Sequence, residues 1–205
     1  MMKLYYAPGA CSLSPHISLH EAGADFEIVR VDTKTHRTET GADYKAVNPK
    51  GCVPALVLES GEVVTEGAAV VQYIADRFPA AKLAPENGTL ARTRLQEQLN
   101  FISSELHKAF SPLFDPTASP DAKEAATLQV AKRLTHVESL LADGRPYLLG
   151  EVFSVADAYL FTVVNWSSGT GIALTQWPHL AAYMQRIGTR PAVRSAMQAE
   201  GLVAA

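Results

Sequence analysis

The stretch that decides the fold spans residues 53–67 and reads VPALVLESGEVVTEG. Two apolar runs, 53–58 and 63–65, flank a polar turn that contains Gly61, and this pattern predicts an antiparallel hairpin. A helix is expected directly after the hairpin, from Gly67 to Arg77, because a proline soon interrupts the helical pattern. Strand, strand and helix therefore follow one another without a long loop.

The sequence before the hairpin predicts a β-α-β unit. A strand over 3–6 leads into a helix over 12–21, which stops at Gly23, and a second strand follows over 26–31. The order β-α-β and then β-β-α implies a small mixed sheet with helices packed against it.

The sequence beyond the hairpin changes character near residue 80. Proline and glycine interrupt residues 80–90, and the segments after them have helical spacing. We therefore predict an α/β domain over 1–79, a linker over 80–90 and an all-helical domain over 91–205. Five helices are expected in this domain. The first carries an apolar stripe at Leu95, Leu99, Ile102 and Leu106, and the third begins at a cap formed by Ser154 and Asp157. The other three are expected over 120–142, 178–187 and 192–200.

Composition excludes several classes of protein. The 205 residues are 47% hydrophobic with a net charge of −3, so the chain can bury a core but lacks the basic stripe that nucleic acid requires. No run approaches the ~18 apolar residues of a membrane span. We expect a soluble, cytoplasmic protein with no membrane or nucleic-acid partner. Two cysteines, Cys11 and Cys52, are too few for a disulfide scaffold.

Cys11 is the first candidate for chemistry. It follows Pro8-Gly9-Ala10, where the first predicted strand meets the first predicted helix. Free amides at a helix N-terminus stabilise a thiolate, so we expect a lowered thiol pKa. Ser14 stands where a C-x-x-C motif has its second cysteine, which disfavours a dithiol oxidoreductase. The alternative is a small buried cysteine without a chemical role.

Two further junctions in the first domain suggest ligand binding. Pro54 opens a strand although it cannot donate to a ladder, which suggests a cis bond that would leave the Val53 backbone free to pair with a peptide-like ligand. Glu66 and Gly67 begin a helix, whose free amides favour a carboxylate.

A polar stripe marks one face of the first long helix. Asn100, Ser104, His107 and Ser111 recur at spacings of four, three and four. An imidazole near a thiol can accept its proton or stabilise the thiolate, so His107 is the second candidate for chemistry. The alternative is an ordinary solvent-facing stripe.

Together these motifs resemble the bacterial beta-class glutathione S-transferases over nearly the whole chain. The resemblance implies a thioredoxin-like, glutathione-binding N-terminal domain, an all-helical domain with a hydrophobic substrate site, and a homodimer. It also implies conjugation of glutathione to hydrophobic electrophiles, as in detoxification. The motifs that carry it are Pro8-Gly9-Ala10-Cys11-Ser12, Asn48-Pro49-Lys50-Gly51, Val53-Pro54-Ala55-Leu56, Thr65-Glu66-Gly67-Ala68, Asn100-Phe101-Ile102, Glu105-Leu106-His107-Lys108 and Ser154-Val155-Ala156-Asp157-Ala158-Tyr159-Leu160-Phe161.

The resemblance also implies roles for individual residues. Cys11 would lie beside the glutathione sulfur, and Val53, next to a cis Pro54, would pair with the cysteinyl backbone. Glu66 and Gly67 would hold the γ-glutamyl end. The remaining residues implied to face the site are Asn100, Ser104, Glu105, Leu106 and His107.

Two positions depart from the family pattern. His36 stands where relatives often have a lysine that contacts the glycine carboxylate of glutathione. A neutral imidazole is a weaker anion partner, so we expect a reduced or pH-dependent affinity. Cys52 stands where relatives commonly have a polar residue without a thiol, and a disulfide between Cys11 and Cys52 stays open.

Several alternatives accompany this interpretation. Cys11 could instead support glutathione-dependent thiol-disulfide exchange or reductive dehalogenation, and the chain could be a non-catalytic binding protein. His16 and His20 lack a third ligand on their face, so we expect no metal. The segment 166–171 is expected to form a loop. Four large aromatic residues are either core or substrate contacts: Phe110, Phe114, Trp166 and Trp177.

Overall fold

The computed structural model describes residues 1–204 and divides the chain into two compact units. The first unit contains Met1–Ala84 together with the residues from Arg190 onward, and the second is Pro85–Thr189. This differs from the predicted helical domain over 91–205. The last helix, α8 (Pro191–Ala199), packs against the first helix of the chain and so belongs to the first unit.

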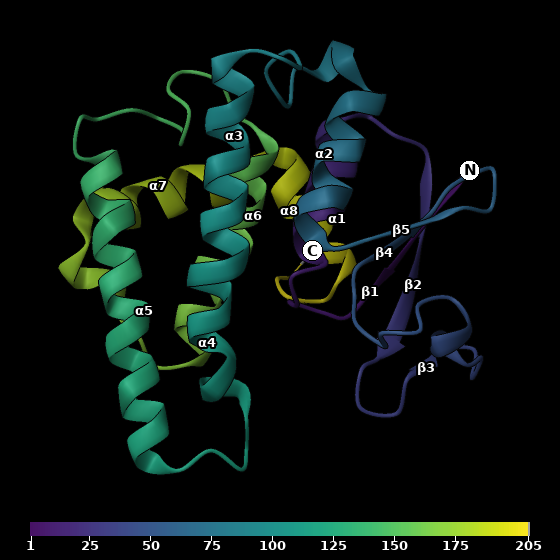
Figure 1. Ribbon diagram of the computed structural model, residues 1–205, viewed down its shortest axis with the longest axis horizontal. Coiled ribbons are helices and arrows are strands. Elements are labelled where there is room, and N and C mark those ends of the chain that lie inside the picture. Colours follow the sequence, from purple (N-terminus) through teal and green to yellow (C-terminus); the bar gives the residue numbers. More distant parts are fainter. Residues whose placement is uncertain (205) are drawn as a thin grey trace. The chain divides into compact units, whose positions relative to one another are not determined.

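The first unit is built on a five-stranded sheet with strand order β3-β2-β1-β4-β5 (Figure 1). Strand β1 pairs with β2 in parallel, and all other pairs are antiparallel. The predicted hairpin is confirmed, with Ala55 opposite Thr65 and Val57 opposite Val63. The strands are β1 (Met2–Tyr6), β2 (Phe26–Asp32), β3 (Arg37–Thr38), β4 (Ala55–Val57) and β5 (Val63–Thr65).

Alternating side chains of β1 divide the core of the first unit into two clusters. Met2, Leu4 and Tyr6 pack with Leu19 of α1 (Leu13–Glu21) and with residues of α2 (Gly67–Arg77). On the other side, Tyr5 packs with a cluster around the buried Tyr44 of the short helix η1 (Tyr44–Ala46). The predicted mixed sheet with helices packed against it, the thioredoxin-like arrangement, is therefore confirmed.

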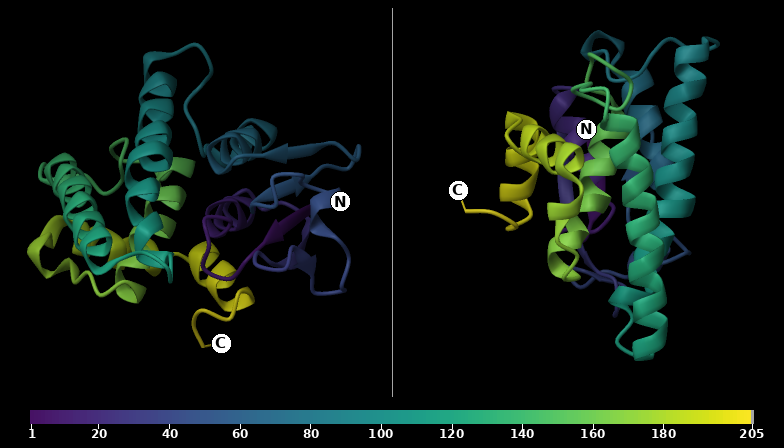
Figure 2. Two further views of the ribbon diagram at one scale, coloured as in Figure 1. Left: turned by 60° about the horizontal axis from the view of Figure 1, so that its bottom comes forward. Right: turned by 90° about the vertical axis from the view of Figure 1, so that its left-hand side faces the viewer.

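Helix α8 lies beside α1 in both views of Figure 2. The guanidinium of Arg190 donates two hydrogen bonds to the carboxylate of Glu21, at 2.6 and 2.8 Å, just before α8 begins. Val193 and Ala196 of α8 are fully buried. The helical spacing of the C-terminal segment predicts a helix but does not reveal which face of the protein the helix covers.

The second unit is helical. The predicted leucine stripe is entirely buried, yet a π-helical turn, η3 (Ile102–Leu106), interrupts the long helix that the stripe predicts. The prediction of a loop over 166–171 is wrong for its first four residues, which belong to α6. The helices are α3 (Leu90–Phe101), α4 (His107–Phe114), α5 (Pro120–Leu141), α6 (Val155–Gly169), η4 (Leu174–Gln176) and α7 (Pro178–Gly188); η2 (Pro79–Ala81) lies in the first unit.

The start of α6 confirms the predicted cap. The Asp157 carboxylate accepts hydrogen bonds from the amide and the hydroxyl of Ser154, both at 2.8 Å. It also accepts from the amide of Leu148 and the hydroxyl of Tyr183, two partners that the local sequence does not reveal. This buried carboxylate therefore ties three segments of the helical unit together. Within the described residues, no helix is long and apolar enough to cross a membrane.

Candidate functional site

The turn between β1 and α1 carries Cys11. Its Sγ donates a hydrogen bond to the carbonyl oxygen of Val53 at 3.3 Å, and the Val53-Pro54 peptide bond is cis, as the sequence suggests. The hydroxyl of Ser14 donates to the Cys11 carbonyl at 2.8 Å, and Ser12 Oγ accepts from the amide of Ala7 at 3.1 Å. The thiol therefore has a fixed place next to the peptide bond before Pro54.

The thiol does not have the lowered pKa that its position suggests. The pKa of Cys11 is raised to about 11, mainly by burial and to a smaller extent by the nearby Cys52 and Glu66. The backbone amides of Cys11 and Ser12 lower the pKa, but by less. Cys11 precedes the first residue of α1 by two positions, and the loss of hydration outweighs the helix-end effect there. Without a ligand, Cys11 is a thiol at neutral pH.

A residue near the other end of the chain anchors the Cys11 turn. Glu200 Oε2 accepts a hydrogen bond from the amide of Gly9 at 2.8 Å, and Oε1 lies 2.9 Å from His16 Nδ1. The side chains of Glu200 and His16 are almost completely buried. The sequence analysis missed this carboxylate, because no local pattern relates residue 200 to the Cys11 turn.

The loop before Val53 is held from inside the first unit. The Cys52 carbonyl accepts hydrogen bonds from the Tyr44 hydroxyl at 2.8 Å and from Asn48 Nδ2 at 2.6 Å. The Cys52 side chain is exposed, and both cysteines are free, so the disulfide that the sequence left open is absent. These two bonds fix the carbonyl that precedes Val53, whose own carbonyl accepts from Cys11.

His36 lies against this same loop. A Cβ on Gly51 would lie 2.7 Å from His36 Cε1 and 2.8 Å from Nδ1, so only glycine fits beside the ring. Gly51 also has a φ of +70°, which favours glycine. His36 Nδ1 is buried without a hydrogen-bond partner in the described part of the chain. The structure thus places His36 and Cys11 against the same loop, His36 at Gly51 and Cys11 at Val53.

Glu66 stands at the N-terminus of α2 with a φ of 68°, unusual for a residue with a side chain. Its carboxylate pairs with the ammonium of Lys50, which also donates to Thr65 Oγ1 at 3.1 Å. Glu66 and Lys50 are both exposed. The pair therefore holds the acidic group at the surface, next to the first amides of α2 at Gly67.

His107 begins α4 in the second unit, directly after the π-helical turn. Its Nδ1 lies 3.1 Å from the Tyr159 hydroxyl, and its ring meets the Trp166 ring edge-on at 4.7 Å between centroids. Burial and the neighbouring charge of Lys108 lower the pKa of His107 to about 4. His107 is therefore neutral at physiological pH.

The other sequence-predicted residues of this helix have different surroundings. Ser104 and Asn100 are exposed, and the Ser104 hydroxyl donates to the Asn100 carbonyl at 2.8 Å. Glu105 pairs with Arg133 of α5 at 2.8 Å, whereas Leu106 is fully buried in the core of the helical unit. The π-helical turn changes the direction of successive side chains, which straight helical spacing cannot anticipate.

The four large aromatic residues divide between core and surface. Phe110 and Trp177 are buried, and the Trp177 indole donates to Thr135 Oγ1 at 3.0 Å, so both belong to the core. Phe114 is exposed and packs edge-on against Trp166 at 5.4 Å between centroids. Phe114, Trp166 and His107 therefore form an aromatic cluster of which part is open to solvent.

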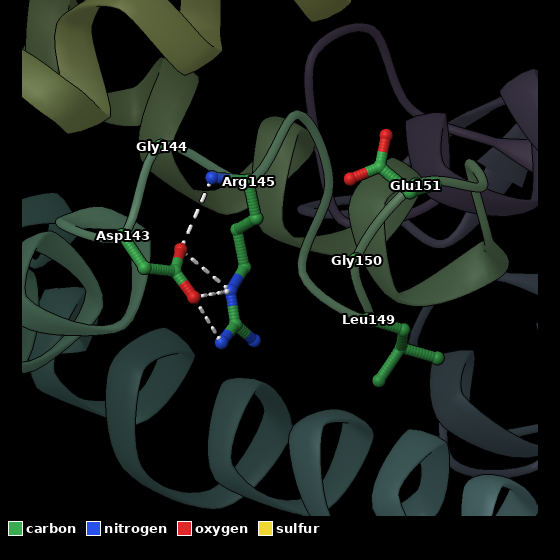
Figure 3. Close-up of a pocket in the computed structure, with 6 residues that line it drawn as sticks. All are labelled: Asp143, Gly144, Arg145, Leu149, Gly150 and Glu151. Atoms are coloured by element: carbon green, nitrogen blue, oxygen red, sulfur yellow. Dashed lines mark hydrogen bonds and ion pairs between the residues drawn. The ribbon is translucent and has the colours of Figure 1, made fainter.

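A surface pocket of about 310 Å³ lies elsewhere in the helical unit, between α5 and α6 (Figure 3). The Asp143 carboxylate holds the Arg145 guanidinium with hydrogen bonds of 2.6–2.9 Å. This neutralises the cation of the pocket, and none of the sequence-predicted site residues lines it. The pocket in Figure 3 is therefore not the candidate site.

Comparison with known proteins gives consistent results. Residues 9–77 match the family model described as glutathione S-transferase, N-terminal domain, and residues 101–191 match that of the C-terminal domain. The chain is 47% identical to glutathione S-transferase GstA of Escherichia coli O157:H7 over 98% of this chain and 100% of that protein.

Two solved structures are similar at the level of the fold. One is described as a bacterial beta-class glutathione S-transferase of Sphingomonas chungbukensis, with 51% identity and a TM-score of 0.95. The other is a sphingomonad glutathione S-transferase complexed with glutathione, with 51% identity and a TM-score of 0.94. Each comparison covers 98% of this chain and 100% of the other chain.

Proposed function

Because the chain belongs to the glutathione S-transferase family, we propose that it is an enzyme that conjugates reduced glutathione to hydrophobic electrophiles. The observation that carries this proposal is the 3.3 Å contact between Cys11 Sγ and the Val53 carbonyl, beside the cis bond to Pro54. A peptide paired with the Val53 backbone has its own side chain close to the Cys11 thiol. In glutathione that side chain carries the reacting sulfur.

The ends of glutathione find complementary groups in the first unit. The γ-glutamyl carboxylate would meet the free amides at Gly67, and the γ-glutamyl ammonium would meet Glu66 in place of Lys50. The unpartnered Nδ1 of His36 would turn toward the glycine end. An imidazole carries less positive charge than an ammonium, so we expect His36 to bind the glycine carboxylate more weakly than a lysine would.

The helical unit would supply the electrophile site. The cluster of Phe114, Trp166 and His107 offers apolar ring surface, suited to aromatic electrophiles. Asn100, Ser104 and Glu105 would form polar parts of the wall. We further propose that the enzyme is a homodimer, as its family resemblance implies, and that it works in the cytoplasm without a metal.

Cys11 is an auxiliary residue in this proposal. Its raised pKa makes it a poor nucleophile at neutral pH, which weakens the alternatives of thiol exchange and reductive dehalogenation through Cys11. As a neutral thiol it can instead donate a hydrogen bond to the sulfur of glutathione. The glutathione thiolate then forms the bond to carbon, and the electrophile releases its leaving group or accepts a proton.

The test is the initial rate of glutathione conjugation to a chlorodinitrobenzene-type electrophile in wild type and Cys11→Ala. We expect a saturable rate in both proteins, reduced about fivefold in the variant by the loss of one hydrogen bond. A rate at background in both proteins would reject conjugation. Activity lost only in the variant would make Cys11 essential and would favour thiol exchange.

A further inference from the structure

Lys45 is an exposed cation of the first unit, in the short helix η1. Its ammonium forms no hydrogen bond or ion pair with any of residues 1–204. By contrast, the ammonium of Lys50 is already bound by Glu66 and Thr65. The ammonium of Lys45 is therefore available to an anionic group of a ligand.

The backbone of Lys45 has a fixed place beside the loop that leads to Val53. Its amide donates a hydrogen bond to Asp43 Oδ1 at 3.1 Å, which caps η1. The preceding residue, Tyr44, is fully buried, and its hydroxyl donates to the Cys52 carbonyl at 2.8 Å. These bonds tie η1 to the loop, so the side chain of Lys45 starts from a defined point next to it.

The side chain of Lys45 extends to Gly51, where it meets the ring of His36. Its Cε, the carbon that carries the ammonium, would lie 3.4 Å from a Cβ on Gly51. The same Cβ would lie 2.7 Å from His36 Cε1 and 2.8 Å from Nδ1. The two side chains therefore come from different elements and converge on one glycine of the loop.

The direction of the proposed ligand brings its free carboxylate to this point. Strands β4 and β5 are antiparallel, so Glu66, directly after β5, lies beside the start of β4, on the Pro54 side of Val53. A peptide that Glu66 holds at its γ-glutamyl end and Val53 holds at its middle therefore continues toward Gly51. An extended residue spans about 3.3–3.6 Å, so the third residue of glutathione, which ends in a carboxylate, falls near Gly51.

We propose that Lys45 is a binding residue for the C-terminal carboxylate of the peptide thiol. This rests on the proposed function, which supplies glutathione as that thiol. An imidazole is a weaker partner of an anion than an ammonium, so Lys45 provides the main attraction and His36 packs beside it. The contact is the same in the bound substrate and in the transition state. It therefore contributes to affinity for the thiol and not to the rate of the chemical step.

Lys34 is the matched control for Lys45. It is exposed in the same unit, two positions before His36, and its ammonium likewise has no partner in the described part of the chain. None of its atoms is among the three nearest to a Cβ on Gly51. Replacing either lysine by methionine removes one positive charge from the first unit, so a difference between the two variants reports the place of the charge.

The first test measures the binding of S-methylglutathione and of its C-terminal amide by isothermal titration calorimetry. The methyl group blocks the thiol, so the measurement needs neither Cys11 nor an electrophile. We expect wild type to bind the carboxylate about tenfold more tightly than the amide, and Lys45→Met to reduce this preference to about twofold. Lys45→Arg should keep most of the preference, and Lys34→Met should leave it near the wild-type value.

Three outcomes of this test would reject a proposal. An equal preference in wild type and Lys45→Met, with matching circular dichroism spectra, would overturn the role of Lys45. A larger loss in Lys34→Met than in Lys45→Met would assign the carboxylate to Lys34 instead. If wild type bound neither ligand, the proposed function itself would fail, whereas tight binding of both ligands without preference would reject only the role of Lys45.

The second test is kinetic. In the conjugation assay Lys45→Met should raise KM for glutathione about fivefold and leave kcat within about twofold of wild type, because the lost contact is the same in the ground state and the transition state. Lys34→Met should change neither constant by more than about twofold. A fall in kcat with an unchanged KM would contradict a role in binding.

Discussion

The Cys11 thiol and the His107 imidazole show how burial decides chemistry at the scale of single residues. Both side chains are held in their neutral forms, because burial raises the pKa of Cys11 to about 11 and lowers that of His107 to about 4. Removal from water disfavours the charged form of an acid and of a base alike. At neutral pH each residue is therefore uncharged and keeps a proton that it can donate to a hydrogen bond.

Alkylation kinetics test the state of the two cysteines. At neutral pH iodoacetamide should modify the exposed Cys52 much faster than Cys11, because only roughly 10⁻⁴ of Cys11 is thiolate when its pKa is about 11. The reaction of Cys11 should accelerate about tenfold per pH unit toward pH 11. Peptide mapping by mass spectrometry measures both rates, and Cys52→Ser should leave only the slow one. Equal rates at neutral pH would show that Cys11 ionises readily.

At the scale of elements, the loop between η1 and β4 is shaped by one close contact. The His36 ring occupies the space where any side chain at position 51 would begin. This contact places an imidazole beside the loop that presents Val53, although His36 lies on a different loop of the first unit. The loop that carries Gly51 and the ring of His36 are therefore packed directly against each other.

Gly51→Ala should destabilise the protein by about 1–3 kcal/mol for two reasons. An alanine is strained at a φ of +70°, and its Cβ would clash with the His36 ring. Gly61→Ala is the matched control, because Gly61 has a φ of +87° but nothing within 4 Å of a Cβ. Urea unfolding measures the loss of stability in both variants. The excess loss at position 51 should disappear in a His36→Ala background; if it persists, the ring is not its cause.

At the scale of the whole molecule, the first unit is closed by the two ends of the chain. Glu200 follows α8 and reaches the amide of Gly9, 191 positions away in the sequence. The same carboxylate bonds His16 in α1. The turn that holds Cys11 therefore depends on a residue far from it in the sequence.

Glu200→Ala should lower the free energy of unfolding by about 3–5 kcal/mol, because it removes the acceptor of the Gly9 amide bond and the carboxylate beside the buried His16 ring. Glu59→Ala, at an exposed position of the hairpin turn, is the control and should change stability by less than about 0.5 kcal/mol. Denaturant unfolding compares the stability of these two variants with that of wild type. Similar midpoints would mean that the buried carboxylate contributes little.

Local signals in the sequence were enough to predict most elements of this fold, although not strand β3, the π-helical turn η3 or the last turn of α6. The hairpin, helix α2 over Gly67–Arg77 and the Asp157 cap of α6 depend on residues a few positions apart, so their patterns can be read without a structure. The same holds for the cis Val53-Pro54 bond, because a proline at the start of a strand points to special geometry. The family motifs made it possible to predict the residues of the candidate site as well.

Tertiary packing determined the long-range partners and the protonation states of the candidate site residues. The Glu200 anchor and the His107–Tyr159 pair join residues 191 and 52 positions apart, and no spacing rule relates such residues. The raised pKa of Cys11 depends on how much water the folded chain excludes, which outweighs the local helix-end effect that the sequence suggests. Elements follow from local interactions, whereas partners and protonation follow from burial, which only the folded chain creates.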